Sequence, residues 1–342
     1  MNKSIRTAAL LISMILVAAA CAAPRATSSA TSAPTGGAAA TASAAPDFTG
    51  KTLNVVTGGT GGVYIIYGAG LAELLNKKLK TSAAAQSTAA SVANMQLIRD
   101  GKADLAFTLS DTAFDAVQGK GAQFTDKKVD AKALAVLYTN YTHIVARDGA
   151  GINTVADLKG KRVSVGAAAS GTEIIANRIL EANGIDPATG ISRERLGVAD
   201  SANALRDNKI DAFFWSGGLP TAQVADLANA VKLKFIGHQD ATKKMADKYG
   251  PFYFDIKMPK GTYKLEEDVT VSGVANILAV PSNMDPALAR AILATMFDNR
   301  ADLEIVHAEA KNLKPETAVE GSPIDYHPGA IDYYKSKGVW KK

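Results

Sequence analysis

The sequence predicts an α/β protein built from two similar domains that face each other across a cleft. Short apolar strand patterns alternate with helix patterns along most of the 342-residue chain, as in layered α/β proteins. The alternation runs through two cycles of one design, each opening with a strand, a loop of small residues and a helix. The body that carries both cycles has about 300 residues, which is enough for two domains.

The first cycle opens with a glycine-rich loop between a strand and a helix. Ser91 is expected to cap the second helix, with Asn94 one turn further on. Ser110 opens the third helix directly after an apolar strand. The expected strands are 52–56, 83–87, 105–109 and 133–138, and the expected helices are 64–80, 91–99 and 110–118.

The second cycle repeats this design. A small-residue loop at 167–172 again joins a strand to a helix, and Gly184 is the expected end of that helix. Both cycles also place a polar turn before an apolar strand, at 101–104 and at 208–211. The expected strands are 143–147, 162–166, 210–215 and 231–236, and the expected helices are the single turn 154–158 and 173–183, 201–208 and 221–229.

The last part of the chain is expected to return to the first domain. A long β-prone run at 269–280 carries it back, a helix follows at 285–307, and the C-terminus reads as rich in loops. The expected domains are therefore lobe I (48–141 and 276–342) and lobe II (142–275). Hinges are expected where the chain crosses between the lobes, near Tyr141-Thr142 and near Ile277-Ala279.

The N-terminus predicts export and membrane attachment. Lys3 and Arg6 precede a short apolar run that is too brief to span a bilayer, so residues 1–21 read as a signal peptide. Cys21, the only cysteine, follows small residues as in a bacterial lipobox, which predicts lipidation. The alternative is an ordinary cleavage site with an incidental cysteine. Residues 22–47 are rich in Ala, Ser, Thr and Pro and are expected to form a flexible tether.

The loop Thr57-Gly58-Gly59-Thr60-Gly61-Gly62-Val63-Tyr64 is the most informative motif. Its glycines leave the first helical N–H groups open, which suits an anion. It lacks the third glycine of a dinucleotide fingerprint, where Tyr64 stands, and the Lys-Ser/Thr pair of a P-loop. The alternative interpretation is a tight turn with close helix–strand contact.

Other small-residue loops also follow strands, and ligands of α/β sheets bind at the carboxyl ends of strands. Facing domains would gather these loops into one cleft, where N–H groups and hydroxyls hold a carboxylate without a cation. Trp215 and Tyr64 either pack against the ligand or belong to the core. The expected cleft residues are Thr60, Gly61, Gly62, Ser91, Ser110, Ser170, Gly171, Thr172, Trp215, Ser216, Gly217 and Gly218.

Several classes of function are disfavoured. Ser170 does not stand in a Gly-x-Ser-x-Gly elbow, and no carboxylate pair is recognisable as acid and base. The four histidines have no metal-ligand spacing, so neither a metal nor a cofactor is expected. The net charge of +5 comes from scattered lysines without a basic run, which argues against nucleic-acid binding. The sequence favours a binding protein over an enzyme.

Four motifs together resemble the TAXI family, the extracytoplasmic solute receptors of tripartite ATP-independent periplasmic (TRAP) transporters. They stand in family order and span nearly the whole body. After Tyr64, however, the chain has Ile65-Ile66-Tyr67 where relatives often carry a second aromatic residue and a proline. The motifs are the glycine loop 57–64, Gln86-Ser87-Thr88-Ala89-Ala90-Ser91-Val92-Ala93-Asn94, Asp211-Ala212-Phe213-Phe214-Trp215-Ser216-Gly217-Gly218-Leu219-Pro220 and His327-Pro328-Gly329-Ala330.

The resemblance implies a two-lobed, type II-like periplasmic-binding-protein fold with a cleft between the lobes. It implies a monomeric, membrane-anchored receptor that delivers an organic anion, often glutamate or 2-oxoglutarate, to an ion-coupled permease. A ligand-sensing subunit of a signalling system and a secreted enzyme on the same fold are the alternatives. The binding residues that the motifs imply are Gly61, Gly62, Tyr64, Ser91, Asn94, Ser110, Ser170, Gly171, Thr172, Trp215, Gly217 and Gly218.

Overall fold

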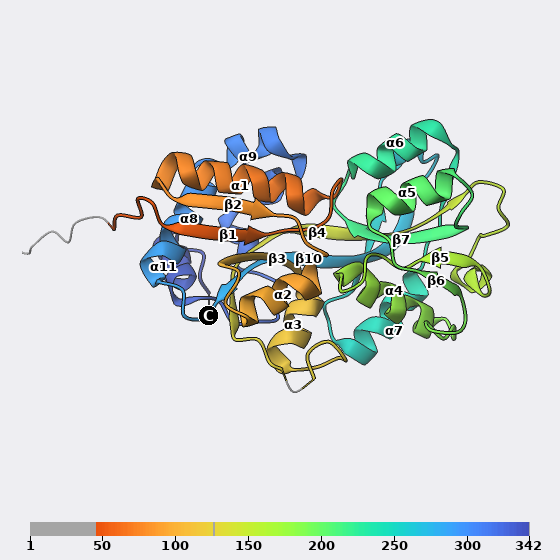
Figure 1. Cartoon of the computed structure of the whole chain (residues 1–342), viewed down its shortest axis with the longest axis horizontal. Helices are drawn as coiled ribbons and strands as arrows, with labels where there is room; N and C mark the ends of the chain where they lie inside the picture. Colours follow the sequence, from red (N-terminus) through yellow and green to blue (C-terminus); the bar gives the residue numbers. More distant parts are fainter. Residues whose placement is uncertain (1–45, 126, 342) are drawn as a thin grey trace, which may run out of the picture. The chain divides into compact units, whose positions relative to one another are not determined.

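Ten β-strands form one mixed sheet in the computed structural model, which describes residues 46–125 and 127–341 (Figure 1). The strand order is β2-β1-β3-β10-β4-β7-β5-β6, with β8 paired to β4 and β9 paired to β10. The strands are β1 (Thr52–Val56), β2 (Ser82–Gln86), β3 (Leu105–Leu109), β4 (Ala131–Arg147), β5 (Arg162–Ser164), β6 (Ser192–Glu194), β7 (Ala212–Gly217), β8 (Leu233–Phe235), β9 (Phe254–Met258) and β10 (Val269–Pro281).

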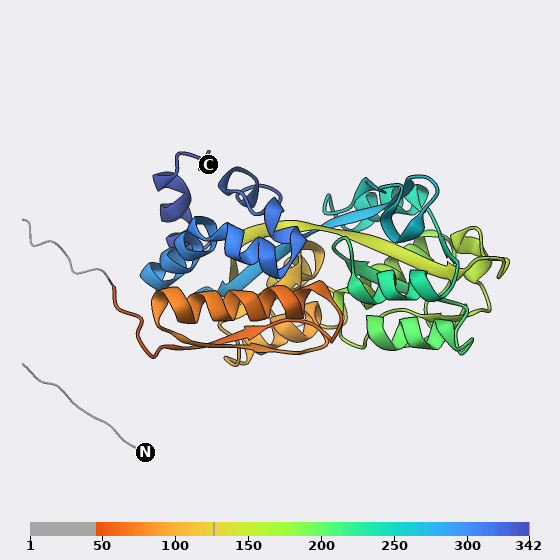
Figure 2. The same ribbon diagram turned by 90° about the horizontal axis from the view of Figure 1, so that it is seen from above.

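Helices cover both faces of the sheet, which confirms the predicted α/β class (Figures 1 and 2). In the half that holds β5–β8, α5 and α6 lie on one face and α4 and α7 on the other. The helices are α1 (Val63–Leu79), α2 (Ser91–Arg99), α3 (Ser110–Gln118), η1 (Val155–Leu158), α4 (Gly171–Ala182), α5 (Val198–Arg206), α6 (Ala222–Ala230), α7 (Gln239–Tyr249), η2 (Thr262–Lys264), α8 (Pro286–Asp298), α9 (Arg300–Val306), η3 (Ala308–Asn312), α10 (Pro315–Ala318) and α11 (Pro328–Ser336).

The long strands β4 and β10 are shared by two α/β halves. They pair antiparallel from Gly273–Tyr141 to Pro281–Ala131. On one side, β10 pairs with β3, which continues to β1 and β2. On the other side, β4 pairs with β7, which continues to β5 and β6. This is the predicted type II-like arrangement, in which strands rather than loops join the two halves.

The prediction of separate strands at 133–138 and 143–147 is wrong, because both belong to the continuous strand β4. The intervening residues include Asn140 and Thr142, which look like an interruption in the sequence. Both side chains are buried, and Asn140 is hydrogen-bonded to Asn276 and Ser216. Burial in a paired strand overrides the polar pattern at this point.

Three clusters of buried hydrophobic side chains form the core. The first packs α1, α8 and α11 against β1, β3 and the adjoining parts of β4 and β10. The second and third lie on opposite faces of β7, because neighbouring strand residues alternate between faces. Phe214 belongs to the second cluster and Phe213 to the third, so both are core residues.

The C-terminal region is more regular than predicted. The expected loops contain α11, which begins at the N-cap His327 and carries the buried Tyr333 and Tyr334 into the first cluster. Gly329 lets α11 lie directly on α8, since a Cβ there would stand 2.1 Å from the Pro286 carbonyl oxygen. The helix predicted at 285–307 is interrupted at Asn299, which separates α8 from α9.

Several elements escaped prediction because their sequences are polar or short. They are β6, α7 and β9, whose outer faces are exposed. The predicted signal peptide, Cys21 and residues 22–45 of the predicted tether lie outside the described residues. Within the described ranges, no helix is both long and apolar enough to cross a bilayer.

His238 joins the start of α7 to β10 through a neutral imidazole. Its Nδ1–H donates to the Ile236 carbonyl at 3.0 Å, and its Nε2 accepts from the Ser272 N–H at 3.0 Å. The second contact requires an unprotonated Nε2. Burial lowers the pKa of His238 to about 4, although the Ile236 carbonyl opposes this shift.

We expect His238 to make the protein less stable in mild acid. Between pH 6.5 and pH 4 the unfolded chain binds a proton that the folded chain excludes, so stability falls as pH falls. From pH 7 to pH 5 this side chain contributes a loss of about 2 kcal/mol in the free energy of unfolding. Urea unfolding of wild type and His238→Gln at both pH values measures this loss. An equal pH dependence in the two proteins would contradict the prediction.

Candidate binding site

A cavity lies where loops from the two halves meet, at the carboxyl ends of strands from both cycles. Its volume is about 70 Å³. Since one water needs about 10–15 Å³ of such space, the cavity holds several waters or one small solute. It is lined by Gly58, Gly59, Gly62, Val63, Tyr64, Thr88, Ala89, Ala90, Leu109, Tyr138, Asn140, Gly166, Ala167, Ser170, Gly171, Thr172, Leu196, Gly197, Val198, Trp215, Ser216 and Gly217.

Five helices begin at this cavity. The N-cap residues of α1, α2, α3, α4 and α5 all line it. Ser170 caps α4 by accepting from the Glu173 N–H at 3.1 Å, whereas the N-caps of the other four make no such side-chain bond. The first N–H groups of a helix have no partner within it, and they carry partial positive charge. The cavity is therefore surrounded by hydrogen-bond donors that favour an anion.

The lining contains no Asp, Glu, Lys, Arg or His side chain. A bound charge would meet dipoles and hydroxyls there instead of an opposite charge. Within residues 46–125 and 127–341, no group of three or more His, Cys, Asp or Glu side chains lies together in a way that would hold a metal ion.

A chain of polar side chains crosses the floor of the cavity. The Tyr64 hydroxyl donates to Asn276 Oδ1, and Asn276 Nδ2 donates to Asn140 Oδ1 at 2.7 Å. Asn140 Nδ2 in turn donates to Ser216 Oγ at 3.3 Å. Burial raises the pKa of Tyr64 well above its usual range, so its hydroxyl remains a neutral donor. The chain links α1 to β7 through the two shared strands.

Part of the predicted site lines the cavity. Tyr64 and Trp215 combine the two roles that the sequence left open, since each lines the cavity and also packs against a hydrophobic cluster. The Trp215 indole N–H is already used, because it donates to Thr221 Oγ1 at 2.9 Å. The predicted residues that line the cavity are Gly62, Tyr64, Ser170, Gly171, Thr172, Trp215, Ser216 and Gly217.

The other predicted residues lie behind the lining or beside it. Asn94 Nδ2 donates to the carbonyls of Thr57 and Phe107 at 2.5 and 2.8 Å, so it joins the ends of β1 and β3. A Cβ on Gly61 would lie 2.3 Å from Gln223, and one on Gly218 would lie 2.7 Å from Glu309. The predicted residues outside the lining are Thr60, Gly61, Ser91, Asn94, Ser110 and Gly218.

The prediction that Ser91 caps α2 is wrong. The N-cap is Ala90, and Ser91 Oγ instead accepts from the Leu109 N–H at 3.2 Å. Ala90 has a φ of +80°, a strained conformation for alanine. Thr88 Oγ1 holds it by accepting the Ala90 N–H at 2.9 Å. The turn at Ala90 therefore lines the cavity with its backbone and has no capping side chain.

The two walls of the cavity are in close contact. A Cβ on Gly171 would lie 2.6 Å from Leu109 and 2.7 Å from Ser91, and one on Gly62 would lie 3.1 Å from the Trp215 ring. In addition, the Ala93 N–H at the start of α2 donates to the Ala169 carbonyl at 3.1 Å. A larger side chain at Gly171 would therefore separate the walls, whereas at Gly62 a Cβ would require only a small shift of the Trp215 ring.

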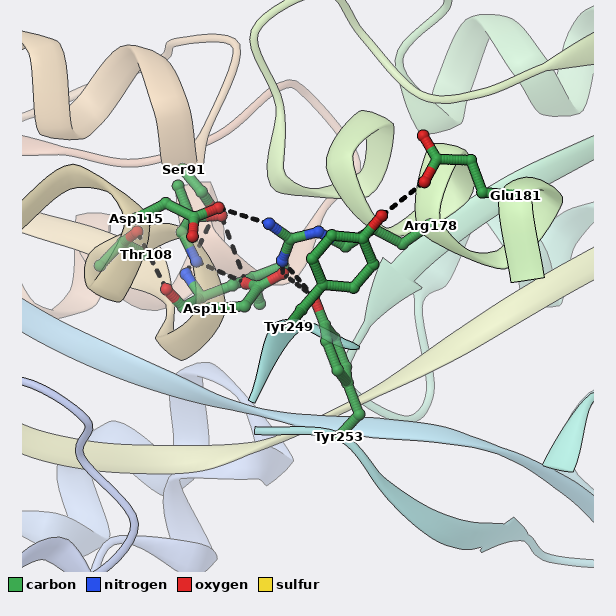
Figure 3. A network of polar contacts seen from close by, with 10 residues as sticks. Ser91, Thr108, Asp111, Asp115, Arg178, Glu181, Tyr249 and Tyr253 are labelled. Carbon is green, nitrogen blue, oxygen red and sulfur yellow. Dashed lines mark hydrogen bonds and ion pairs between the residues drawn. The ribbon is translucent and has the colours of Figure 1, made fainter. Parts of the chain in front are cut away.

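A buried ion network next to the cavity joins α3 to α4 (Figure 3). Arg178 Nη2 contacts Asp115 Oδ2 at 2.5 Å and its Nη1 contacts Asp111 Oδ2 at 3.3 Å. The Tyr253 hydroxyl donates to Asp111 Oδ2 at 2.6 Å, and the guanidinium lies over the Tyr249 ring at 4.2 Å. The network fixes two of the helices that begin at the cavity.

The charges of this network depend on one another. Burial alone would lower the pKa of Arg178, but Tyr253, Asp111 and Asp115 raise it above its ordinary value. Burial raises the pKa of Asp115, although Arg178 opposes the shift. The desolvation of each group is thus offset only while its partners are present.

Some lining residues were not predicted. Leu196, Gly197 and Val198 follow β6, a three-residue polar strand with too weak a pattern to reveal the loop after it. Tyr138 and Asn140 lie inside β4, which the sequence divides in two. Gly197 stands just before a helix pattern, and this glycine is the one local signal in the sequence for the loop after β6.

The chain is similar to one family of known proteins and to several solved structures. Residues 55–338 match the sequence profile described as the NMT1-like family. Among solved structures, the periplasmic aliphatic sulphonate binding protein of Escherichia coli is 17% identical, with 85% of this chain and 80% of that chain covered and a TM-score of 0.44. The alkanesulfonate-binding protein of Xanthomonas axonopodis pv. citri, bound to MOPS, is 15% identical, with 84% and 91% covered and a TM-score of 0.47. The solutes named for these two structures are those of the two proteins themselves.

We expect Arg178→Met to destabilise the fold strongly, because two buried carboxylates lose their cation. The loss in the free energy of unfolding should be about 3–5 kcal/mol. The matched control is Arg162→Met, which removes the more exposed pair with Asp211 and should cost at most about 1 kcal/mol. Urea unfolding at pH 7 compares the two variants.

The combined variant Arg178→Met, Asp111→Asn, Asp115→Asn removes the unpaired charges and should recover much of the lost stability. Equal stability of the Arg178 and Arg162 variants would show that the buried network contributes no more than a surface pair.

Proposed function

The chain belongs to the NMT1-like family, and we propose that it is the solute-binding receptor of a TRAP-type transporter. Its ligand is a small organic anion with a carboxylate, the class that includes glutamate and 2-oxoglutarate, and it delivers this solute to an ion-coupled membrane permease. The observation that carries the proposal is the cavity at which five helix N-termini from both halves converge without any charged side chain.

This arrangement supports binding rather than catalysis. Unpaired N–H groups at helix starts hold an anion reversibly, and their partial charges are stronger in a site that excludes water. The lining carries no acid–base pair and no charged nucleophile. We propose that Gly62, Tyr64, Ser170, Gly171, Thr172, Trp215 and Gly217 contact the solute, while Gly61, Ser91, Asn94, Ser110 and Gly218 position the loops around it.

The solute is proposed to bind between two lobes, residues 48–141 with 276–342 and residues 142–275. The hydrophobic clusters support this division, because the first contains residues of lobe I and the others lie mainly in lobe II. Bending of β4 near Tyr141 and of β10 near Ile277 would open the cleft, since both strands cross between the lobes at these positions.

The receptor is proposed to act at the outer face of a membrane as a monomer. Residues 1–21 would direct export, lipid on Cys21 would anchor the chain, and residues 22–47 would give it reach. The TAXI motifs in the sequence support the TRAP permease as its membrane partner. No cofactor is part of the proposal.

A thermal-shift screen tests the ligand class. We expect small carboxylates to raise the melting temperature of the purified full chain. At a hundredfold excess over the dissociation constant, a bound solute adds about 2.7 kcal/mol to the free energy of unfolding. Neutral amides of the same acids serve as controls and should have little effect. If no organic anion changes the melting temperature, the receptor proposal fails. Turnover of a screened compound would favour the enzyme alternative.

We expect Gly171→Val to weaken solute binding at least about tenfold, because its side chain would separate the walls at Leu109 and Ser91. Ala301→Val is the matched control, since it places the same side chain at an exposed position of α9, outside the lining. Calorimetric titration of both variants with the best carboxylate measures the effect. Unchanged affinity of Gly171→Val would remove the contact between α4 and Leu109 from the binding mechanism.

A further inference from the structure

We propose that the cavity selects a small monocarboxylate with an apolar body and no ammonium group. This inference rests on the proposed function and narrows its ligand. It depends on which hydrogen-bonding groups of the lining remain free, on the absence of charged side chains among the lining residues, and on the apolar residues of the walls.

The free hydroxyls of the lining are donors. Ser170 Oγ accepts from the Glu173 N–H at 3.1 Å, and Thr172 Oγ1 accepts from the Ser216 N–H at 3.3 Å. Ser216 Oγ accepts from Asn140 Nδ2 at 3.3 Å. An oxygen that already accepts a bond has its O–H left to offer. These three hydroxyls, together with the helix N–H groups, therefore present donors to a carboxylate.

The acceptors of the lining are largely occupied. The carbonyls of Gly59, Ala167 and Gly197 accept from the N–H groups of Gly62, Ser170 and Ser201. No carboxylate side chain lines the cavity. An ammonium group is a donor in all directions, and burying it without acceptors is strongly unfavourable. An amino acid would bring such a group into a cavity built of donors.

A second carboxylate would also be poorly accommodated. One carboxylate can share the partial charges of several helix starts, but no Lys, Arg or His lines the cavity to neutralise another. Two buried anionic groups without a cation repel each other and lose their hydration. The donor set therefore suits a single negative charge.

The remaining wall is apolar and suits a hydrocarbon body. Leu109 lines the cavity from one half, and Leu196, Val198 and Trp215 line it from the other. Tyr138 also lines the cavity, and its buried hydroxyl has no hydrogen-bond partner among the described residues. Burial raises the pKa of Tyr138 well above its ordinary value, so this hydroxyl is one more neutral donor beside the cavity.

Four related acids test the effects of the ammonium group and of the second carboxylate separately. Calorimetric titration of the full chain uses 2-oxobutanoate, 2-aminobutanoate, 2-oxoglutarate and glutamate, which differ by the ammonium group, the second carboxylate, or both. We expect 2-oxobutanoate to bind at least about tenfold more tightly than each of the other three. Equal or tighter binding of 2-oxoglutarate or of either amino acid overturns this inference and leaves the proposed receptor function intact.

No binding of any of the four also overturns the inference, and failure of every organic anion in the thermal screen overturns the receptor function as well.

Thr172→Val tests the donor set, because it removes one hydroxyl at nearly constant shape. We expect it to weaken 2-oxobutanoate binding about tenfold. Thr142→Val is the matched control, since the buried Thr142 hydroxyl has no partner in the described chain and lies outside the lining. Equal affinity of the two variants would exclude Thr172 as a donor to the solute.

Discussion

The antiparallel pairing of β4 with β10 is the constraint on which the rest of the structure depends. β10 pairs with β3 in one half and β4 pairs with β7 in the other, so the pairing between β4 and β10 is what joins the two sheet halves. The carboxyl ends of β1, β2 and β3 in one half and of β5, β6 and β7 in the other, with the loops after them, line one cavity. The cavity is a consequence of this strand order.

Polar groups buried around the cavity determine how the halves contact each other. Tyr64, Asn276, Asn140 and Ser216 form a hydrogen-bonded chain along its floor, while Arg178 joins α3 to α4 beside it. Such networks are favourable only when every member is paired. They therefore specify one arrangement of the walls more strongly than apolar packing does.

The same walls offer a physical basis for ligand recognition. Helix starts and hydroxyls supply donors, and the lining supplies no charge of its own. A site of this kind discriminates through unsatisfied groups, since a wrong ligand leaves a buried charge without a partner. The proposed preference for a single carboxylate follows from this imbalance between donors and acceptors.

The sequence by itself determined the α/β class, most helices and strands, and the glycine loop, because these depend on local periodicity and turn chemistry. It also placed Ser170 at a helix start. Only the tertiary structure decided that β4 is continuous, that Ser91 supports Leu109 instead of capping α2, and that Arg178 pairs with Asp111. Those features join residues far apart in the chain, and burial and pairing there override the local preference of each segment.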